Sequence, residues 1–209
     1  MKITLALLKR LPKVELHCHL DGSLRVPTII DLAEKQKVEL PSHDIDQLTK
    51  ILTIGKKRGT LEEYLKRFEI TLSVLQTPEA LVRVARELGE DAAAENVRYM
   101  EIRYSPILHT DMGLTPQESV VAVRKGLMQA EKEFGIKSRI IICGIRNIGA
   151  ASSLKLADLA IQFKNKGVVG FDLAGAEENF PAKHHREAFY LILNNNINAT
   201  IHAGEAFGP

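Results

Sequence analysis

The stretch LPKVELHCHLDGSLR, residues 11–25, decides the fold of this chain. Residues Val14–Leu20 form a run of strand length, and the polar turn Asp21-Gly22-Ser23 follows it directly. In a β/α barrel, active sites are built at the carboxyl ends of the strands, which is where this polar turn would lie. The stretch therefore predicts a first strand that carries side chains toward a functional site.

His17 and His19 lie on this strand with Cys18 between them. Side chains alternate along a strand, so the two imidazoles share one face and can bind one metal ion. The alternative is that each histidine is a hydrogen-bonded polar residue near a strand end, and His-x-His alone slightly favours that reading. The polar turn that follows shifts the balance toward a metal site.

Apolar runs of strand length alternate with stretches of helical period along the rest of the chain. The further predicted strands are Val97–Tyr104, Arg139–Ile145, Val168–Leu173 and Asn198–His202. The predicted helices are Pro27–Lys37, a helix that begins with a capping box at Thr60 and continues through Leu72, Pro78–Asn96, Pro116–Phe134, Ser152–Lys166 and Ala182–Asn195. This order predicts parallel β-α-β crossovers in an α/β fold, with a helical insertion after the first strand. Residues 1–209 read as one domain.

Five parallel strands permit either an open doubly wound sheet or part of a barrel, and periodicity does not decide between them. No G-x-G-x-x-G follows the first strand, so a dinucleotide-binding sheet has no support. The residues at the strand ends favour the barrel.

His202-Ala203-Gly204-Glu205 closes the last predicted strand and offers a third imidazole. Three protein ligands and an open position are the common arrangement of catalytic zinc. The alternative for this motif alone is a turn with an exposed carboxylate. Together with His17 and His19, it predicts a metal cluster at one mouth of the fold.

Other polar residues near strand ends suggest supporting roles. Asp172 lies within an apolar run, where a carboxylate is costly unless it is paired, and we interpret it as structural support. Glu177 is interpreted as solvated or structural. Glu101, Arg103 and Ser105 share one face of their strand, and we expect the Glu and the Arg to pair with each other or with neighbours.

Composition excludes several classes of function. The 209 residues carry a formal net charge of +2, and the densest basic cluster, Lys56-Lys57-Arg58, is short, so neither nucleic acid nor a membrane is an expected partner. Cys18 and Cys143 suggest no disulfide framework. The apolar run Ile3–Leu8 is too short for a signal peptide or a membrane span, and we expect a cytoplasmic protein.

The chain resembles the adenosine deaminase family. The segments that carry the resemblance stand in the family's order and spacing: LPKVELHCHLDGSLR, MEIRYSP, DLAGAE and TIHAGE. The resemblance implies a TIM-type (β/α)8 barrel, here about five strands of it. It also implies hydrolytic deamination of adenosine, and of 2'-deoxyadenosine, to inosine and ammonia by a zinc-activated water.

The resemblance also implies a role for particular residues. His17, His19 and His202 match the ligands of one Zn²⁺, and Glu205 matches the proton donor to the purine ring. Gly175 matches the residue whose amide contacts a ring nitrogen. Asp21 matches the position that hydrogen-bonds the ribose, where a relative acting on free adenine has Glu. Deamination of adenine or another purine nucleoside or nucleotide, or a relative without catalysis, stays open.

The family also uses a His after a sixth strand and an Asp-Asp pair after an eighth, and the sequence ends at Pro209 before such positions. We interpret His184 and His185 as surface residues that do not replace them. We therefore expect an incomplete chain that is inactive alone, binds zinc weakly at most, and associates through unpaired barrel edges.

Overall fold

A single parallel sheet forms the centre of the computed structural model, which describes residues 3–53 and 60–206. Its strands are β1 Lys13–His19, β2 Val97–Tyr104, β3 Lys137–Ile145, β4 Val168–Ala174 and β5 Asn198–Ala199. They lie side by side in chain order, β1-β2-β3-β4-β5, and every neighbouring pair is parallel. Strand order that never reverses is the order of a β/α barrel, since a doubly wound sheet reverses at its switch point.

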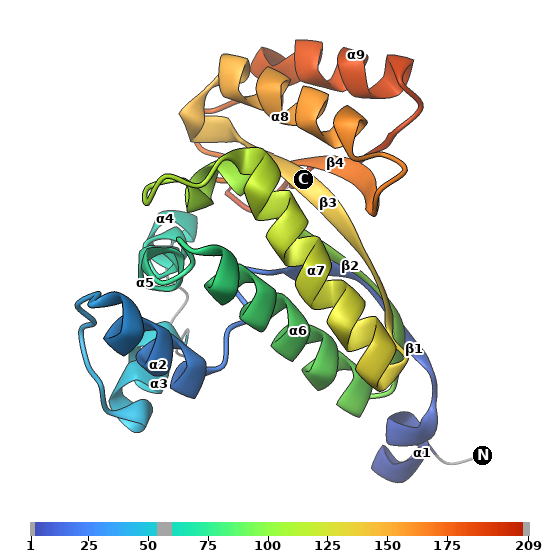
Figure 1. The fold of residues 1–209 in the computed structure, drawn as a ribbon. Helices are drawn as coiled ribbons and strands as arrows, with labels where there is room; N and C mark the ends of the chain where they lie inside the picture. Colours follow the sequence, from blue (N-terminus) through green and yellow to red (C-terminus); the bar gives the residue numbers. More distant parts are fainter. Residues whose placement is uncertain (1–2, 54–59, 207–209) are drawn as a thin grey trace.

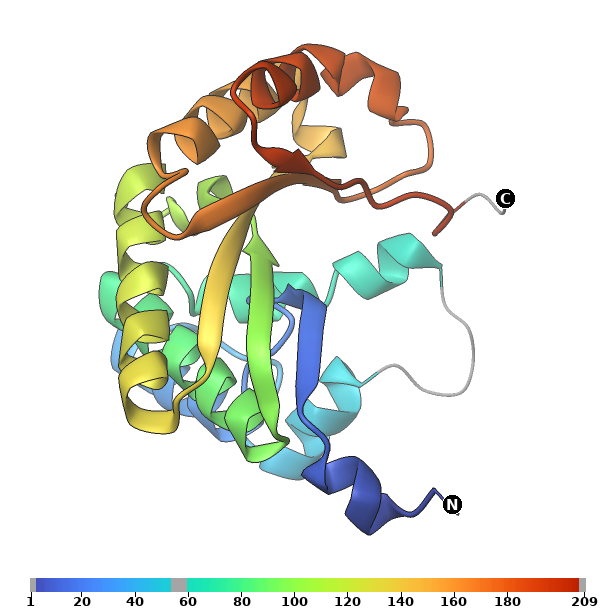
Figure 2. The same cartoon turned by 90° about the vertical axis from the view of Figure 1, so that its right-hand side faces the viewer.

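Four long helices cover one side of this curved sheet (Figure 1, Figure 2). They are α6 Pro78–Ala94, α7 Pro116–Phe134, α8 Ala150–Gln162 and α9 Arg186–Asn194. Helices α6 and α7 approach closely at Gly126, where an added Cβ would lie 2.2 Å from the carbonyl oxygen of Val82. The helices follow the strands on one face, and the fold is the expected α/β arrangement of an incomplete barrel.

Strand β2 shows how alternation assigns the two faces of the sheet. Met100, Ile102 and Tyr104 are buried in the core cluster that the helices cover. Glu101 and Arg103 alternate with them and therefore point to the opposite, inner face. Polar side chains thus collect inside the curve of the sheet.

The insertion after β1 contains α2 Val26–Gln36, α3 Ile45–Leu52, α4 Leu61–Leu65 and α5 Phe68–Ser73. The capping box at Thr60 is confirmed, but the single helix predicted beyond it is wrong, because α4 and α5 are separate. The amide of Arg67 bonds the carbonyl of Tyr64, three residues back, and this tighter turn interrupts the α-helical bonding. Helix α3 was not predicted, and the basic cluster Lys56–Arg58 lies outside the described residues.

Several other predicted bounds differ in the structure, including the helix predicted over Ser152–Lys166, which is α8 Ala150–Gln162. The fifth strand was predicted to reach His202, but β5 ends at Ala199, although the amides of Thr200 and His202 still bond the carbonyls of Phe171 and Leu173 at 2.9 and 3.0 Å. The predicted helix Ala182–Asn195 begins instead as a 3-10 turn, η3 Ala182–His185. The N-terminal apolar run contributes to a short helix, α1 Leu5–Arg10.

Within the described part of the chain, β1 and β5 each pair on one side only. Val14 and Leu16 on β1 are 61% and 53% exposed, so this edge of the sheet presents apolar side chains. Among the same residues, none of the helices is long and apolar enough to cross a membrane. Both cysteines are free thiols.

Candidate metal centre and the cavity beside it

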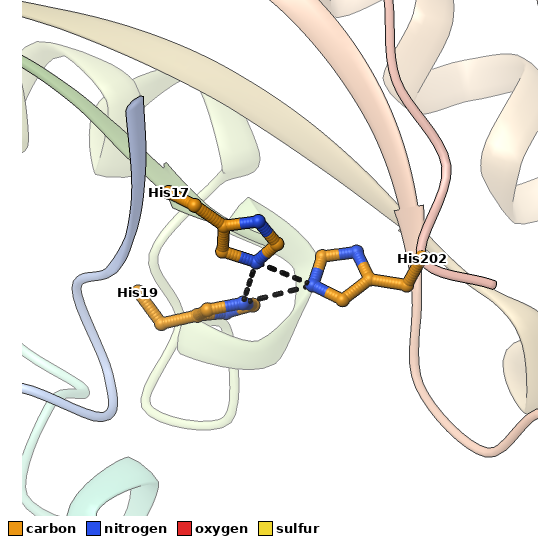
Figure 3. A group of neighbouring side chains, drawn as sticks. All are labelled: His17, His19 and His202. Atoms are coloured by element: carbon orange, nitrogen blue, oxygen red, sulfur yellow. Dashed lines mark hydrogen bonds between the residues drawn. The ribbon is translucent and has the colours of Figure 1, made fainter. Parts of the chain in front are cut away.

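Three histidines from distant parts of the sequence meet at the carboxyl end of the sheet (Figure 3). The Nε2 atom of His17 lies 3.3 Å from Nε2 of His19 and 2.9 Å from Nε2 of His202. The remaining Nε2 distance, between His19 and His202, is 3.1 Å. Among the histidines, cysteines and carboxylates of the described residues, these three form the group that is close enough to hold a metal ion.

Local structure explains the position of each ring. His17 and His19 project from the same face at the end of β1, as the alternation of a strand requires. His202 reaches the same point because its amide bonds the carbonyl of Leu173, which continues the pairing with β4 beyond β5. The buried Arg146 also donates to the carbonyl of His202 at 2.5 Å.

A buried ion pair stands behind His202. Its Nδ1 atom lies 2.7 Å from Oδ2 of Asp172, and the same Oδ2 lies 3.2 Å from the guanidinium of Arg103. Thr200 donates to the other carboxylate oxygen at 2.8 Å. Burial by itself raises the pKa of Asp172, but His202, Thr200 and Arg103 outweigh it and lower the pKa to about 2. The charged Asp172 therefore faces Nδ1 of His202, and Nε2 points toward the other two histidines.

The charge state of His17 and His19 suits a metal ion. Burial lowers the pKa of His19 to about 4, helped by His202, His17 and Arg103. Burial and then Arg103 also lower the pKa of His17. Both rings are accordingly neutral near pH 7, which is the form that ligates metal.

The donor set fits a divalent metal ion. Zinc bonds of about 2.0–2.1 Å in tetrahedral geometry place ligand nitrogens about 3.3 Å apart. The three observed Nε2 separations are close to this value, and neutral imidazole with a carboxylate behind it is a common zinc ligand. His17, His19 and His202 can therefore hold such an ion.

One cavity of about 430 Å³ lies beside the histidines. Every residue to which the sequence assigned a role in the site lines it, namely His17, His19, Asp21, Gly175, His202 and Glu205. Cavities of this size bind drug-sized ligands when polar groups converge within apolar walls. Residues that are far apart in the sequence, and that were each assigned a role in the site, therefore line one cavity in the folded structure.

Asp21 brings an unpaired polar atom to this cavity. The side chain is 5% exposed, and its Oδ1 atom has no hydrogen-bond partner within the described structure. Burial raises the pKa of Asp21 to about 7. A buried oxygen without a partner is costly, so a ligand hydroxyl that donated to it would be favoured.

Gly175 directly follows β4 in a conformation that suits glycine. Its φ is +91°, and an added Cβ would lie 2.9 Å from Oδ1 of Asn147. Any side chain here would be strained and would crowd Asn147, which lines the same cavity. The backbone of Gly175 therefore stays open to a ligand.

The opposite wall of the cavity is apolar, and sequence reasoning missed it. Tyr64 and Phe68 pack edge to face with ring centroids 5.3 Å apart, and Phe68 also stacks edge-on at 6.4 Å from His19. The remaining apolar lining residues are Leu61, Leu65, Leu72, Leu108, Ile145, Ile148 and Ala174. The helical spacing of Leu61, Tyr64, Leu65, Phe68 and Leu72 was visible in the sequence, but it indicated a packed face rather than a cavity wall.

The contacts of Asp172, Arg103 and Glu101 test the supporting roles that the sequence suggested for them. The interpretation of Asp172 as structural support agrees with its contacts. Arg103 pairs with Asp172 and the carbonyl of Leu16, while Glu101 accepts from the hydroxyl of Tyr99 at 2.8 Å, so their mutual pairing is wrong and pairing with neighbours is confirmed.

His185 was interpreted as a surface residue, and this is wrong. Its side chain is buried, and Nδ1 lies 2.8 Å from Oγ of Ser153 on α8. His184 is exposed, as expected. The register of η3 against α8 turns one of the two adjacent rings inward, which a sequence pattern does not reveal.

The sequence model of the adenosine deaminase family matches residues 12–209. A probable adenosine deaminase of Dictyostelium discoideum is 47% identical over 204 residues, which is 98% of this chain and 26% of that protein. The adenosine deaminase of Clostridium perfringens strain SM101 is 44% identical over 198 residues, which is 95% of this chain and 60% of that enzyme. The chain thus spans three-fifths or less of these relatives.

Solved structures resemble this fold closely. A cog1816 amidohydrolase from Burkholderia ambifaria with bound Zn gives a TM-score of 0.86 at 28% identity, over 98% of this chain and 56% of that one. Adenine deaminase from Arthrobacter aurescens gives 0.83 at 30% identity, over 95% and 59%. An N6-mAMP deaminase from Arabidopsis gives 0.81 at 27% identity, over 96% and 61%.

Proposed function

This chain belongs to the adenosine deaminase family, and we propose that the complete protein hydrolyses adenosine, and 2'-deoxyadenosine, to inosine and ammonia. We further propose that residues 1–209 form a single domain, the N-terminal portion of a β/α-barrel metallohydrolase. One observation carries the proposal: three histidine Nε2 atoms meet beside a cavity that Asp21, Gly175 and Glu205 also line.

The cavity supplies groups for both halves of a nucleoside. The apolar wall around Tyr64 and Phe68 suits a flat purine ring. The unpaired oxygen of Asp21 suits a ribose hydroxyl, and the open backbone of Gly175 suits a ring nitrogen. Binding through both ends would orient C6 of the purine toward the histidines.

We propose one Zn²⁺ held by His17, His19 and His202. When bound, zinc acts as a Lewis acid that makes water a competent nucleophile near neutral pH. Asp172 would hold the ring of His202 in the ligating tautomer, since a carboxylate behind a metal-bound imidazole fixes its orientation. His202, Thr200 and Arg103 together keep the pKa of Asp172 low, so that it stays ionised for that task.

The chemistry of the purine assigns Glu205 its role. Addition of water at C6 interrupts the aromatic system and shifts electron density to N1, which then requires a proton. Glu205 lines the cavity, and its carboxyl group would donate that proton to N1 as a general acid. The attacking water supplies two protons: one passes to the exocyclic nitrogen, so that the C6–N6 bond breaks and ammonia leaves, and the other restores the carboxyl group of Glu205.

A second candidate is deamination of free adenine or of a purine nucleotide. The structural likeness to an adenine deaminase and to an N6-mAMP deaminase supports this second candidate. Asp21 at the proposed ribose position supports the nucleoside instead. A relative that binds purines without turnover is the third candidate.

The test is a substrate panel with the purified complete protein. Adenosine, 2'-deoxyadenosine, adenine, AMP and N6-methyl-AMP are incubated separately, and ammonia release and the ultraviolet spectrum are followed. We expect the highest kcat/KM for adenosine, and loss of activity after chelation that zinc restores. Higher kcat/KM for adenine or a nucleotide would select the second candidate, and binding without ammonia release would select the third.

A further inference from the structure

The carboxylate of Glu177 accepts hydrogen bonds from three consecutive backbone amides in the loop that carries Glu205. Oε1 accepts from the amide of Gly204 at 2.9 Å, and Oε2 accepts from the amides of Glu205 and Ala206 at 2.8 Å each. Hydrogen bonds to an ionised acceptor are about twice as strong as neutral ones. One side chain therefore fixes the main chain on both sides of Glu205.

Glu177 is itself anchored beside another group of the site. It lies two residues after Gly175, where an added Cβ would crowd Asn147. The connection from Gly175 through Glu177 to Glu205 is thus short. It joins the two loops that would both contact a bound purine ring.

Arg146 ties the same two loops at a second point. Its guanidinium donates to the carbonyl of Phe180 at 3.0 Å and to the carbonyl of His202 at 2.5 Å. Phe180 belongs to the loop after β4, and His202 begins the loop that carries Glu205. Glu177 and Arg146 together bridge the loops, but only Glu177 bonds the turn at Glu205 itself.

The turn needs such a bond because its own conformation is permissive. Gly204 has a φ of +83°, and no regular structure includes residues 200–206. Glycine allows many backbone conformations, so the preceding residue does little to orient Glu205. An external acceptor is the feature that selects one of them.

We propose that Glu177 is the positioning residue for Glu205, and this inference rests on the proposed function. By bonding the amides of Gly204, Glu205 and Ala206, it sets the distance between Gly175 and the Glu205 carboxyl group. Proton transfer requires the donor within hydrogen-bond reach of the ring nitrogen. A displacement of about 1 Å can cost about 100-fold in rate.

The first test asks whether the bonds exist, independently of activity. Amide hydrogen exchange of Gly204, Glu205 and Ala206 is measured in the complete protein, in Glu177→Gln and in Glu178→Gln. Gln at 177 keeps the size but offers one acceptor oxygen, and its NH₂ group opposes the amides. Glu178 is the matched control, because it is the adjacent carboxylate and is exposed. We expect exchange about tenfold faster or more in Glu177→Gln alone. Unchanged exchange overturns the proposal.

The second test asks whether the bonds matter to the reaction. For Glu177→Gln we expect kcat for adenosine to fall about 10- to 100-fold, with KM within threefold and zinc content unchanged. Glu178→Gln should match the unaltered protein. Retention of kcat within twofold, or loss expressed in KM or zinc content instead, overturns the positioning role.

A third variant keeps the proposal testable if Glu177→Gln folds poorly. Glu177→Asp keeps the charge on a shorter side chain, and we expect it to retain more kcat than Glu177→Gln. If Glu177→Asp and Glu177→Gln both keep the melting temperature of the unaltered protein and lose kcat equally, the proposal is overturned. If the unaltered protein deaminates no purine, the proposed function fails, and the exchange experiment alone then decides whether Glu177 holds the turn.

Discussion

Oδ2 of Asp172 lies 2.7 Å from Nδ1 of His202, on the side of the imidazole that faces away from the other two histidines. The carboxylate is fully buried and is shared with Arg103, so its charge is compensated within the sheet. This contact connects the interior of the barrel to the metal centre. It leads to the first prediction.

Replacement of Asp172 by Asn should weaken zinc binding by about 10- to 100-fold, because the ring of His202 loses the partner that orients it. Competition against a chromogenic chelator measures the affinity. Asp158→Asn, an exposed change on α8, is the control. The Asp172→Asn protein should also have a lower melting temperature, since Arg103 loses its buried counterion. Unaltered zinc affinity in a folded Asp172→Asn protein would contradict the assignment of His202 as a ligand.

Replacement of Glu205 by Gln should lower kcat for adenosine by about 10²- to 10⁴-fold, the usual contribution of a general acid. Zinc content, measured by atomic emission, should stay the same because Glu205 is not one of the proposed zinc ligands. Glu187→Gln, exposed on α9, serves as the control. Full activity in Glu205→Gln would remove it from the mechanism.

Replacement of Asp21 by Ala should lower kcat/KM for adenosine by about 10- to 100-fold, because a hydrogen bond to the ribose is lost. The same variant should change kcat/KM for free adenine little, since adenine has no ribose. Steady-state kinetics on both substrates give the comparison, with Asp46→Ala on α3 as an exposed control. An equal fall for both substrates would show that Asp21 acts on the ring or on the fold.

His109 should make the protein sensitive to acid. Burial lowers its pKa from 6.5 to about 4, and its Nδ1 lies 3.0 Å from the carbonyl of Leu75. Between these two pH values the unfolded chain binds a proton that the folded chain does not. The stability contribution is therefore complete above about pH 6.5 and is lost as the pH falls toward 4, by up to about 3 kcal/mol.

The variant His109→Asn isolates this contribution, because Asn can still donate to Leu75 but does not titrate. Denaturant unfolding at pH 7 and at pH 4.5 gives the free energy of unfolding of each protein. We expect the advantage of the unaltered protein over His109→Asn to shrink at pH 4.5. A difference that is independent of pH would exclude His109 as the source of the acid sensitivity.

Local patterns predicted the strands and most of the helices, although they missed α3 and joined α4 with α5. Alternation placed His17 and His19 on one face, and helical spacing gave α7 its correct bounds. Where patterns failed, a contact distant in sequence had intervened. His185 is buried because Ser153 on α8 meets it, and Arg103 turns to Asp172 rather than to Glu101.

The sequence by itself was enough to predict β1 to β4 within two residues of their bounds, because alternation and apolar runs are properties of neighbouring residues. Its resemblance to a family named six of the residues that line the cavity. Only the tertiary structure decided that three Nε2 atoms lie within 3.3 Å of one another and that Asp172 stands behind His202. It also decided that Glu177 holds the turn of Glu205. These contacts depend on the register of parallel strands and the path of loops, which many residues set jointly and no single motif encodes.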